Sequence, residues 1–382
     1  MKRLLNALAA DDGLTRYVGG AVRDDLLDLP VNDIDLATRL EPDEVVKRLE
    51  VARIKAVPTG IDHGTITAVS DGHPYEVTTL RRDVSTDGRR ATVAFTSDWQ
   101  EDAARRDFTI NALFADPATG EIFDYFGGLH DLAARHVRFI GDPRTRIAED
   151  HLRILRYFRF HARFGAGEPD AAALEACTAR ANDLMALSRE RIADELLKLL
   201  RLSDPSATVR IMLERNILRP VLPEITVDSA DRLDRLVADE READISPEGL
   251  RRLAALLPPE PAVAQDVAAR LKLSNKARTR LACGAGRDIG STPEALAYRL
   301  GIECAVDRLL LAGSIDEAAR IEGWQSPHLP IGGGTLISRG LPEGPAVART
   351  LRKIEERWIE AGFPDGDRLE DIVTRALGEA SS

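Results

Sequence analysis

The chain has 382 residues and a formal net charge of −11, with 44% hydrophobic and 30% charged residues. A globular chain of this length is expected to form two or more packed units. The negative charge argues against a general nucleic-acid binder, whose affinity comes largely from neutralising phosphates. No apolar run approaches the roughly 18 residues of a membrane span, and the N-terminal stretch lacks a signal peptide's apolar core, so we expect a cytoplasmic protein without a membrane partner.

Charge is segregated along the sequence. Residues 135–163 contain eight arginines against three acids, whereas residues 224–248 contain nine acids against three arginines. An RNA substrate is expected to lie on the first region and to avoid the second. The three cysteines, Cys177, Cys283 and Cys304, have neither a metal-ligand spacing nor the pattern of a disulfide framework, which indicates a reducing compartment.

The stretch from residue 17 to residue 38 predicts a strand, a glycine turn at Gly19-Gly20, a short helix and a second strand. Glycines allow backbone N–H groups to approach an anion closely, and a helix start favours negative charge. Asp33 and Asp35 alternate with an apolar residue, so a strand would project both carboxylates from one face. Because adjacent carboxylates repel unless a cation lies between them, the stretch predicts a Mg²⁺–nucleotide site.

A helix over residues 42–50 and three strands over 52–57, 63–69 and 74–80 are expected next, separated by turn signals. Glu76 lies in the third strand, among residues that favour β-structure. Residues 81–100 are polar and without clear periodicity, which predicts a mobile loop. The following segment offers Arg106 to neutralise triphosphate charge and Asp107 to orient an arginine or a ribose hydroxyl.

A further helix is predicted from the N-cap Asp142 and the following proline, and it runs through the sequence EDHLRILRYFRF. Asp150 and Arg153 are three residues apart, so a continuous helix would make them neighbours, with Arg156 and Arg159 continuing the same ridge. A carboxylate and a guanidinium can together recognise the Watson–Crick edge of cytosine or adenine. Beyond residue 170 the sequence is expected to be helical, ending in a helix over residues 345–361.

Together these blocks resemble the class II tRNA nucleotidyltransferase (CCA-adding enzyme) and bacterial poly(A) polymerase family, within the polymerase-β superfamily. The motifs are GGAVRD, DID, YEVTT, EDAARRDFTINA, EDHLR and SRERIADELLK, and they span roughly residues 15–200. The resemblance implies an α+β fold, with a nucleotidyltransferase head built on a mixed sheet with flanking helices. Residues 1–140 would form this catalytic head, 141–215 a helical neck for nucleotide selection, and 216–382 a helical body and tail that binds tRNA.

The resemblance also implies the activity, which is addition of CMP and AMP to the 3′ end of tRNA from CTP and ATP, with Mg²⁺ as cofactor. Asp33, Asp35 and Glu76 would be catalytic, and the first two would hold the metal. The implied nucleotide-binding residues are Gly20, Arg23 and Arg106 at the triphosphate, and Asp150, Arg153, Arg156 and Arg159 at the base.

Three alternatives share parts of this pattern. A poly(A) polymerase would add AMP only, but such enzymes of this family usually carry a basic Gly-Arg-Arg/Lys-Arg-Phe motif where this chain has TGIDHGT at residues 59–65. A CC-only or an A-only adding enzyme would carry the same motifs. A degenerate RNA-binding module would be expected to have lost a metal carboxylate, and all are present here. Oligomeric state cannot be read from these patterns.

Overall fold

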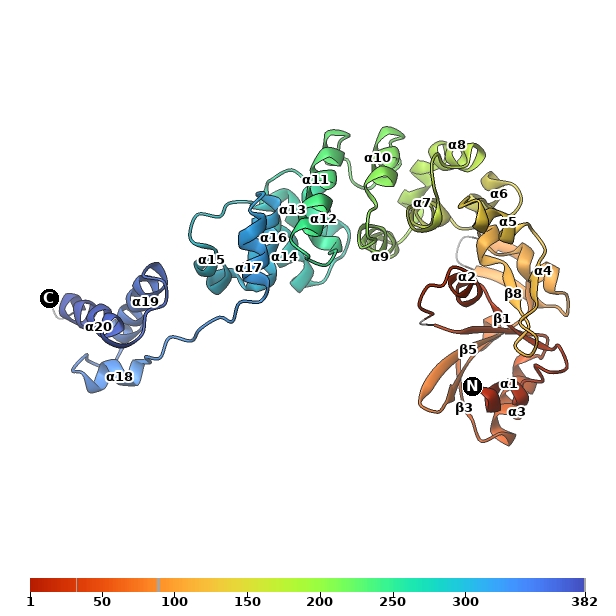
Figure 1. Cartoon of the computed structure of the whole chain (residues 1–382), viewed down its shortest axis with the longest axis horizontal. Helices are drawn as coiled ribbons and strands as arrows, with labels where there is room; N and C mark the ends of the chain where they lie inside the picture. Colours follow the sequence, from red (N-terminus) through yellow and green to blue (C-terminus); the bar gives the residue numbers. More distant parts are fainter. Residues whose placement is uncertain (32, 88–89, 381–382) are drawn as a thin grey trace. The chain divides into compact units, whose positions relative to one another are not determined.

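The computed structural model describes residues 1–31, 33–87 and 90–380, which form two compact units, Met1–Pro223 and Glu224–Ser382. Within the described residues the first unit combines strands and helices, and the second is built from helices (Figure 1). The predicted α+β class, a mixed sheet with flanking helices followed by a helical region, is confirmed.

A seven-stranded mixed sheet forms the centre of the first unit, in the order β3-β4-β5-β2-β1-β8-β9. β2 and β5 are parallel, and the other neighbouring pairs are antiparallel. The strands are β1 (Thr15–Val18), β2 (Asp35–Thr38), β3 (Lys55–Gly60), β4 (Thr65–Ser70), β5 (His73–Thr79), β8 (Leu113–Ala115) and β9 (Ile122–Asp124). The three strands predicted after the acidic pair are therefore present, shifted by up to three residues.

Two apolar clusters flank this sheet. One joins α1 (Lys2–Ala7) and α3 (Pro42–Val51) to Leu36 and Val77, and the other joins α4 (Trp99–Ala104) to Ala37 and Phe114. Leu36 and Ala37 are consecutive in β2, so the two clusters lie on opposite faces. Burial of these faces fixes the strand register and with it the direction of the acidic side chains next to them.

Residues 81–100 contain a hairpin where a loop without secondary structure was expected. β6 (Arg81–Asp87) and β7 (Arg90–Phe95) pair antiparallel, from Arg81 opposite Phe95 to Asp87 opposite Arg90. Residues 88–89 of the predicted mobile segment lie outside the described residues. The sequence signal failed because this ladder is held by backbone pairing and lacks the alternating apolar pattern of a buried strand.

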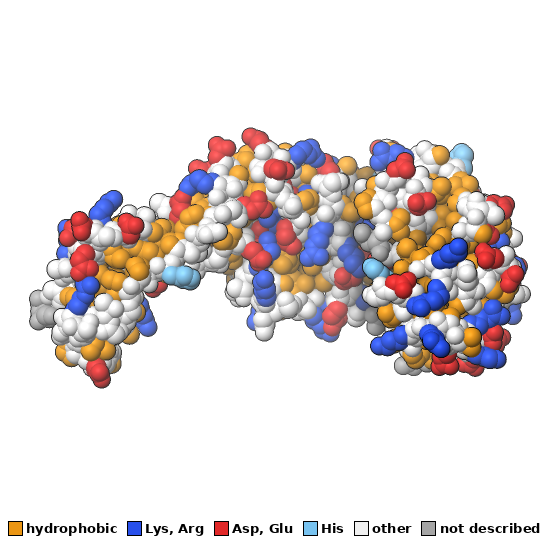
Figure 2. Space-filling model, turned by 60° about the horizontal axis from the view of Figure 1, so that its bottom comes forward, with side chains coloured by type: hydrophobic (Ala, Val, Ile, Leu, Met, Phe, Trp, Pro, Cys, Tyr) orange, Lys and Arg blue, Asp and Glu red, His pale blue; other side chains and the backbone are white. Residues whose placement is uncertain are grey.

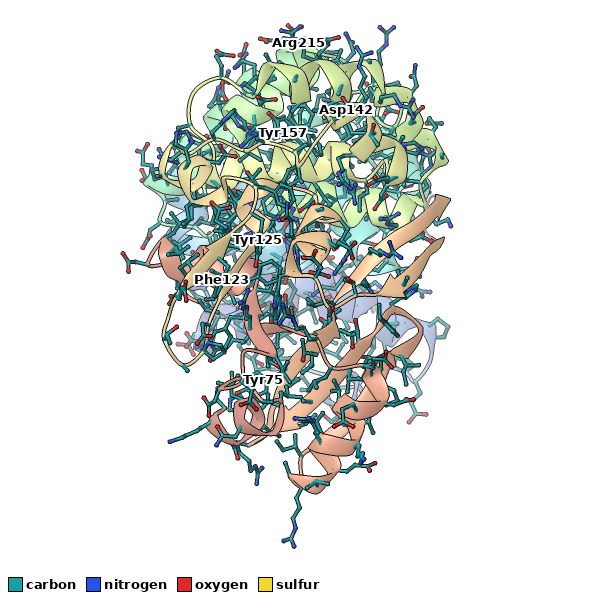
Figure 3. All side chains as sticks on the ribbon, turned by 90° about the vertical axis from the view of Figure 1, so that its right-hand side faces the viewer. Tyr75, Phe123, Tyr125, Asp142, Tyr157 and Arg215 are labelled. Atoms are coloured by element: carbon teal, nitrogen blue, oxygen red, sulfur yellow. A yellow bond between two sulfur atoms is a disulfide. The ribbon has the colours of Figure 1, made fainter. Side chains whose placement is uncertain are left out.

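Helices of the first unit cover the sheet and continue beyond it. They are α2 (Gly20–Leu26), α5 (Gly128–Ala133), α6 (Pro143–Glu149), α7 (Arg153–Phe164), α8 (Ala171–Ala179), α9 (Arg189–Leu200) and α10 (Ser206–Glu214). Asp142 caps α6 as predicted, its carboxylate accepting from Thr145 N at 2.8 Å. Tyr157 on α7, labelled in Figure 3, is fully buried. Its ring stacks on that of Phe139, with ring centroids 5.5 Å apart, which fixes α7 against the preceding segment.

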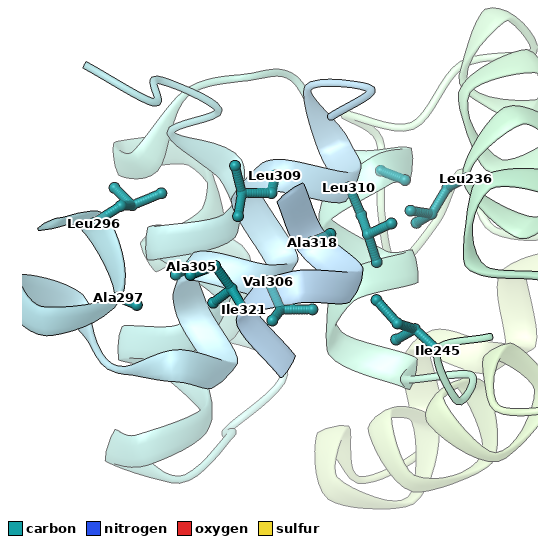
Figure 4. Packing of buried hydrophobic residues seen from close by; sticks show 11 residues of the cluster. Leu236, Ile245, Leu296, Ala297, Ala305, Val306, Leu309, Leu310, Ala318 and Ile321 are labelled. Atoms are coloured by element: carbon teal, nitrogen blue, oxygen red, sulfur yellow. The ribbon is translucent and has the colours of Figure 1, made fainter. Parts of the chain in front are cut away.

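The second unit packs its helices around two apolar clusters. The helices are α11 (Asp228–Glu242), α12 (Gly249–Leu256), α13 (Pro261–Arg270), α14 (Asn275–Ala285), α15 (Pro293–Leu300), α16 (Ile302–Leu311), α17 (Ile315–Glu322), α18 (Gly333–Ser338), α19 (Pro345–Glu360) and α20 (Gly366–Ala380). Leu309 and Ile321 belong to one cluster (Figure 4), and Trp358 and Val373 to the other. The helix expected over 345–361 is thus present as α19, but α20 follows it.

One expectation about the cysteines is wrong. Cys283 on α14 and Cys304 on α16 form a disulfide, with their Cα atoms 6.1 Å apart. Their separation of 21 residues has no recognisable motif, and only the packing of α14 against α16 brings the thiols together. Cys177 is free and buried.

No helix among the described residues is long and apolar enough to span a bilayer.

Candidate active site

A cavity of about 690 Å³ in the first unit brings together most of the residues singled out in the sequence. Every predicted nucleotide- or metal-binding residue lines it, and Glu76 lies outside it. Its lining comprises Gly19, Gly20, Ala21, Arg23, Asp24, Val31, Asp33, Asp35, Arg105, Arg106, Asp107, Asn111, Asp150, Arg153, Arg156, Arg159, Phe160 and Arg163.

Two acidic residues lie at the start of β2. Asp33 is exposed just before the strand, and Asp35 is its first residue. Asp35 is paired in register with Glu76 of β5, so these two carboxylates project side by side from adjacent parallel strands. Burial raises the pKa of Asp35, and the neighbouring Glu76 and Asp33 carboxylates raise it further, against the opposing effect of Arg106. A cation between these oxygens would relieve this repulsion.

The donor set fits a metal that is completed by its substrate. In residues 1–31, 33–87 and 90–380, no three His, Cys, Asp or Glu side chains are arranged to hold an ion by themselves. Mg²⁺ is commonly held by one or two carboxylates together with phosphate oxygens and water. Asp33 and Asp35 face a cavity lined by arginines. They therefore suit an ion that is held jointly by two carboxylates and bound phosphate, rather than one held by protein ligands alone.

The glycine turn brings backbone and guanidinium groups close together. Gly19 has φ = +70°, a conformation that L side chains rarely adopt, and a Cβ there would lie 3.2 Å from a guanidinium nitrogen of Arg106. Any side chain at this position would be strained and would press on that arginine. The turn thus leaves room at the cavity wall beside Arg106.

Arg23 is held firmly in the cavity wall. Its side chain is only 5% exposed, donates to Asp24 Oδ1 at 2.7 and 2.8 Å and to Asn111, and lies 4.2 Å from the ring centre of Phe164. Desolvation lowers the pKa of Arg23, and Asp24 counteracts this in part. Arg23 therefore supplies a fixed positive charge whose direction is set by its neighbours.

Asp102, a buried carboxylate to which the sequence assigns no role, holds both arginines of the RRD motif. It is 1% exposed and pairs with Arg105 at 2.7 Å and with Arg106 at 3.0 Å, and it also accepts from Arg81 N at 3.3 Å. Although burial would raise the pKa of Asp102, Arg106 and Arg105 outweigh it and the pKa is lowered. The same carboxylate thus fixes the cavity arginines and the start of β6.

Asp107 orients an arginine, which is one of the two roles predicted for it. Arg156 donates to its Oδ2 at 2.5 and 2.9 Å, and Asn111 donates to its Oδ1 at 3.0 Å. Burial would raise the pKa of Asp107, but these donors and the Phe108 N–H lower it. The pair joins α7 to the segment after α4 across the floor of the cavity.

The expected helical pair of Asp150 and Arg153 does not exist. The chain is extended at Asp150 (φ −150°, ψ 108°), so α6 ends before it and α7 begins after it. Asp150 instead accepts from Arg191 of α9 at 2.7 Å, and Arg153 pairs with Glu149 of α6. Both side chains still line the cavity, but each is positioned by a different helix, because the break at Asp150 separates them.

Two residues of α9, Arg191 and Glu195, bond side chains of this wall without lining the cavity themselves, and the sequence assigns them no individual roles. Glu195 is 3% exposed and accepts from Arg159 Nε at 2.5 Å, one helical turn beyond Arg191. The spacing of Arg191 and Glu195 places both on one face of α9, which was the available signal. Arg163 at the cavity rim lies 3.4 Å from Asp24 of α2.

The cavity's charge favours a polyanion. Seven arginines line it against five aspartates. On the face of the protein seen in Figure 2, by contrast, acidic and basic side chains are interspersed. An arginine-rich cavity that also contains the carboxylates of Asp33 and Asp35 can hold a nucleoside triphosphate together with a divalent cation.

Comparisons with known proteins agree with this geometry. Residues 15–138 match the family described as the poly A polymerase head domain, and residues 168–228 match the family described as a probable RNA and SrmB-binding site of polymerase A. The mitochondrial CCA tRNA nucleotidyltransferase 1 of Mus musculus is 33% identical over 95% of this chain and 87% of its own length.

Bacterial relatives extend the similarity. The CCA-adding enzyme of Latilactobacillus sakei is 32% identical over 91% of this chain and 90% of its own length. The crystal structure of the Bacillus stearothermophilus CCA-adding enzyme in complex with CTP superposes with a TM-score of 0.76 at 26% identity, covering 100% of this chain and 98% of that one.

Proposed function

Because this chain belongs to the CCA tRNA nucleotidyltransferase family, we propose that it adds CMP and AMP to the 3′ end of tRNA, using CTP and ATP. The observation that carries the proposal is the arginine-rich cavity bordered by Asp33 and Asp35. Its excess of positive charge suits a triphosphate, and its paired carboxylates suit Mg²⁺. A cytoplasmic location stays a prediction.

In this proposal the tRNA 3′-hydroxyl oxygen bonds to the α-phosphorus of the incoming nucleotide. The bond from that phosphorus to the bridging oxygen breaks, pyrophosphate leaves, and the hydroxyl proton passes to Glu76. Mg²⁺ bound by Asp33 and Asp35 would polarise the hydroxyl and neutralise charge on the leaving group. Arg106, fixed by Asp102, and Arg23, fixed by Asp24, would hold the triphosphate before reaction.

Base selection is proposed for Asp150, Arg153, Arg156 and Arg159. The support is that Arg191, Glu149, Asp107 and Glu195 respectively hold these side chains in place beside the cavity. A side chain that is already held in its binding orientation loses little conformational entropy when the base binds. A uracil or guanine in this position would leave buried polar groups unpaired.

The division into a catalytic head (1–140), a neck (141–215) and a tRNA-binding body and tail (216–382) stays part of the proposal. Its first boundary is supported by the end of the head-domain match at residue 138. The second is supported by the nearby change of compact unit after Pro223.

The test is nucleotide incorporation into a tRNA transcript that lacks its CCA end, with Mg²⁺ and each triphosphate alone or together. Two C residues from CTP, followed by one A from ATP, are expected. Addition that stops after CC, or A added only to a transcript already ending in CC, would identify a CC-only or A-only enzyme. Long A tails from ATP alone on any RNA would overturn the proposal in favour of a poly(A) polymerase.

A further inference from the structure

A second hollow lies on the other side of the acidic residues from the nucleotide cavity. Its volume is about 410 Å³, and Thr59, Gly60, His63, Thr65, Thr67, Glu76 and Arg81 line it. Asp33 and Asp35 border the nucleotide cavity, whereas Glu76, the register partner of Asp35, borders this hollow. The two spaces therefore meet at adjacent carboxylates of β2 and β5.

The floor of the hollow is made of hydroxyl groups. Tyr75, labelled in Figure 3, packs against the apolar cluster that includes α1 and α3. Because successive side chains of a strand alternate, its neighbour Glu76 projects from the opposite face. Thr67 of β4 lies directly opposite Glu76, and Thr65 lies opposite Thr78. These threonines alternate with the buried Ile66 and extend the same open face away from the carboxylates.

An irregularity in β3 adds another hydroxyl to this floor. The pairing of β3 with β4 shifts register between Val57 and Gly60, and Thr59 Oγ1 lies 2.9 Å from Thr67 Oγ1. A β-bulge redirects side chains and is frequent beside functional sites. After it, the 3₁₀ turn Ile61–His63 brings the exposed ring of His63 to the rim, and Arg81 fixes that turn by donating to the His63 carbonyl.

We call the three threonines at the base of this hollow, Thr59, Thr65 and Thr67, the threonine floor. We infer that the hollow binds the terminal nucleotide of the RNA that is being extended. The inference rests on the proposed function. In an in-line displacement the attacking and leaving oxygens lie on opposite sides of the phosphorus. Since the arginines that suit pyrophosphate line one side of the carboxylates, the hydroxyl must arrive from the other, where the threonine floor lies.

The lining suits a ribose with a base. Uncharged hydroxyls can donate to and accept from the ribose 2′-hydroxyl, the group that distinguishes RNA from DNA. An exposed aromatic ring such as that of His63 offers a surface on which a base can stack without sequence readout. In this inference Thr59 and Thr67 contact the 2′-hydroxyl, and His63 stacks on the base.

The test uses the full-length protein and the same tRNA transcript, ending in C, with either a normal or a 2′-deoxy terminal ribose. Thr59→Val and Thr67→Val are made together, so that neither hydroxyl loses its partner alone, and the fold is checked by thermal unfolding. The KM for tRNA should rise about 5- to 10-fold, with the KM for CTP unchanged. The wild type should lose a similar factor on the 2′-deoxy transcript, and the double variant should lose no more.

Two further variants make the test decisive. His63→Ala in the exposed turn should raise the KM for tRNA, and His63→Phe should restore it by stacking. Thr119→Val, in the exposed turn between β8 and β9, is the matched control and should change nothing. An unchanged tRNA KM in both the double variant and His63→Ala, or an effect on the CTP KM instead, would overturn the inference. A wild-type protein that extends no RNA would instead refute the proposed function.

Discussion

Two clusters of arginines and acids, one in each compact unit, use the same chemical groups in different ways. In the second unit Arg251 bonds Glu240 and Asp307 at 2.7 Å each, and Arg252 bonds Glu240 at 2.8 Å. These four side chains are between 1% and 5% exposed. Arg280 completes the network by pairing with Asp307 at 2.7 Å.

The cluster in the first unit is arranged around open space. Its arginines are also fixed by acids, but they outnumber the aspartates at the cavity, and Asp33 and Asp35 project there without an arginine bonded to them in the described structure. Buried charges that are fully paired contribute to the fold, whereas unpaired charges of either sign beside a cavity indicate a ligand-binding site. The comparison predicts that substitutions in the two clusters will separate activity from stability.

The largest effect is expected at the metal carboxylates. Asp35→Asn, like Asp33→Ala, should slow incorporation of both CMP and AMP by about a thousandfold or more, because charge stabilisation at the reacting phosphate is lost. Single-turnover incorporation measures the rate, and tRNA binding by filter retention should survive. Normal turnover of Asp33→Ala at saturating Mg²⁺ would remove the metal assignment.

The same Asp35→Asn variant should be more stable than the wild type. The pKa of Asp35 is raised in the folded protein, so ionisation of this carboxyl lowers the free energy of unfolding. The loss is absent below the unfolded pKa of Asp35 and is complete once the pH has risen through the folded pKa. Removing the charge should add about 0.5–2 kcal/mol at neutral pH. Urea unfolding at pH 7 and pH 4 tests this, and a gain that does not shrink at the lower pH would contradict it.

Breaking the buried network of the second unit should lower stability and leave activity nearly unchanged. Asp307→Ala leaves Arg251 and Arg280 without their shared carboxylate, which should cost about 3–5 kcal/mol of stability. Urea unfolding gives the free energy, and the turnover of the remaining folded enzyme at low temperature should be near normal. A stable protein with lost activity would place this network in the function.

Asp107 lies between these extremes. Its pKa is lowered in the folded state, so its stabilising effect is complete above its unfolded pKa and is lost as pH falls through the folded value. Asp107→Asn should cost about 1.5–3 kcal/mol at neutral pH, since hydrogen bonds to a charged group are lost. Acid unfolding should then begin from a lower plateau with a shallower slope, and identical acid profiles would refute the role.

The last expected effect concerns selectivity and leaves turnover largely intact. Asp150→Ala and Arg153→Ala should each reduce discrimination against UTP and GTP by about 1–3 kcal/mol, while the triphosphate stays bound. Misincorporation rates measure this, and Arg144→Ala, which breaks an exposed pair with Glu175, is the control. Slower but fully selective variants would assign Asp150 and Arg153 a structural role.

By itself the sequence determined the fold class and identified 11 of the 18 residues that line the cavity. Local patterns suffice where the signal is local: Gly19-Gly20 requires a turn, and Asp142 with Pro143 starts α6. Side chains alternate along β2, so Asp35 projects from the face opposite to Leu36. These features depend on neighbours within a few residues.

Tertiary structure alone decided which charges meet. Arg191 reaches Asp150 from 41 residues away, Arg156 reaches Asp107 across 49, and Cys283 joins Cys304 through helix packing. The backbone break at Asp150 reversed an expectation based on helical spacing, because Asp150 precedes α7 and its side chain bonds Arg191 of α9, while Arg153 bonds Glu149. Pairings of this kind depend on how helices pack against a sheet, and no periodicity in the chain encodes that distance.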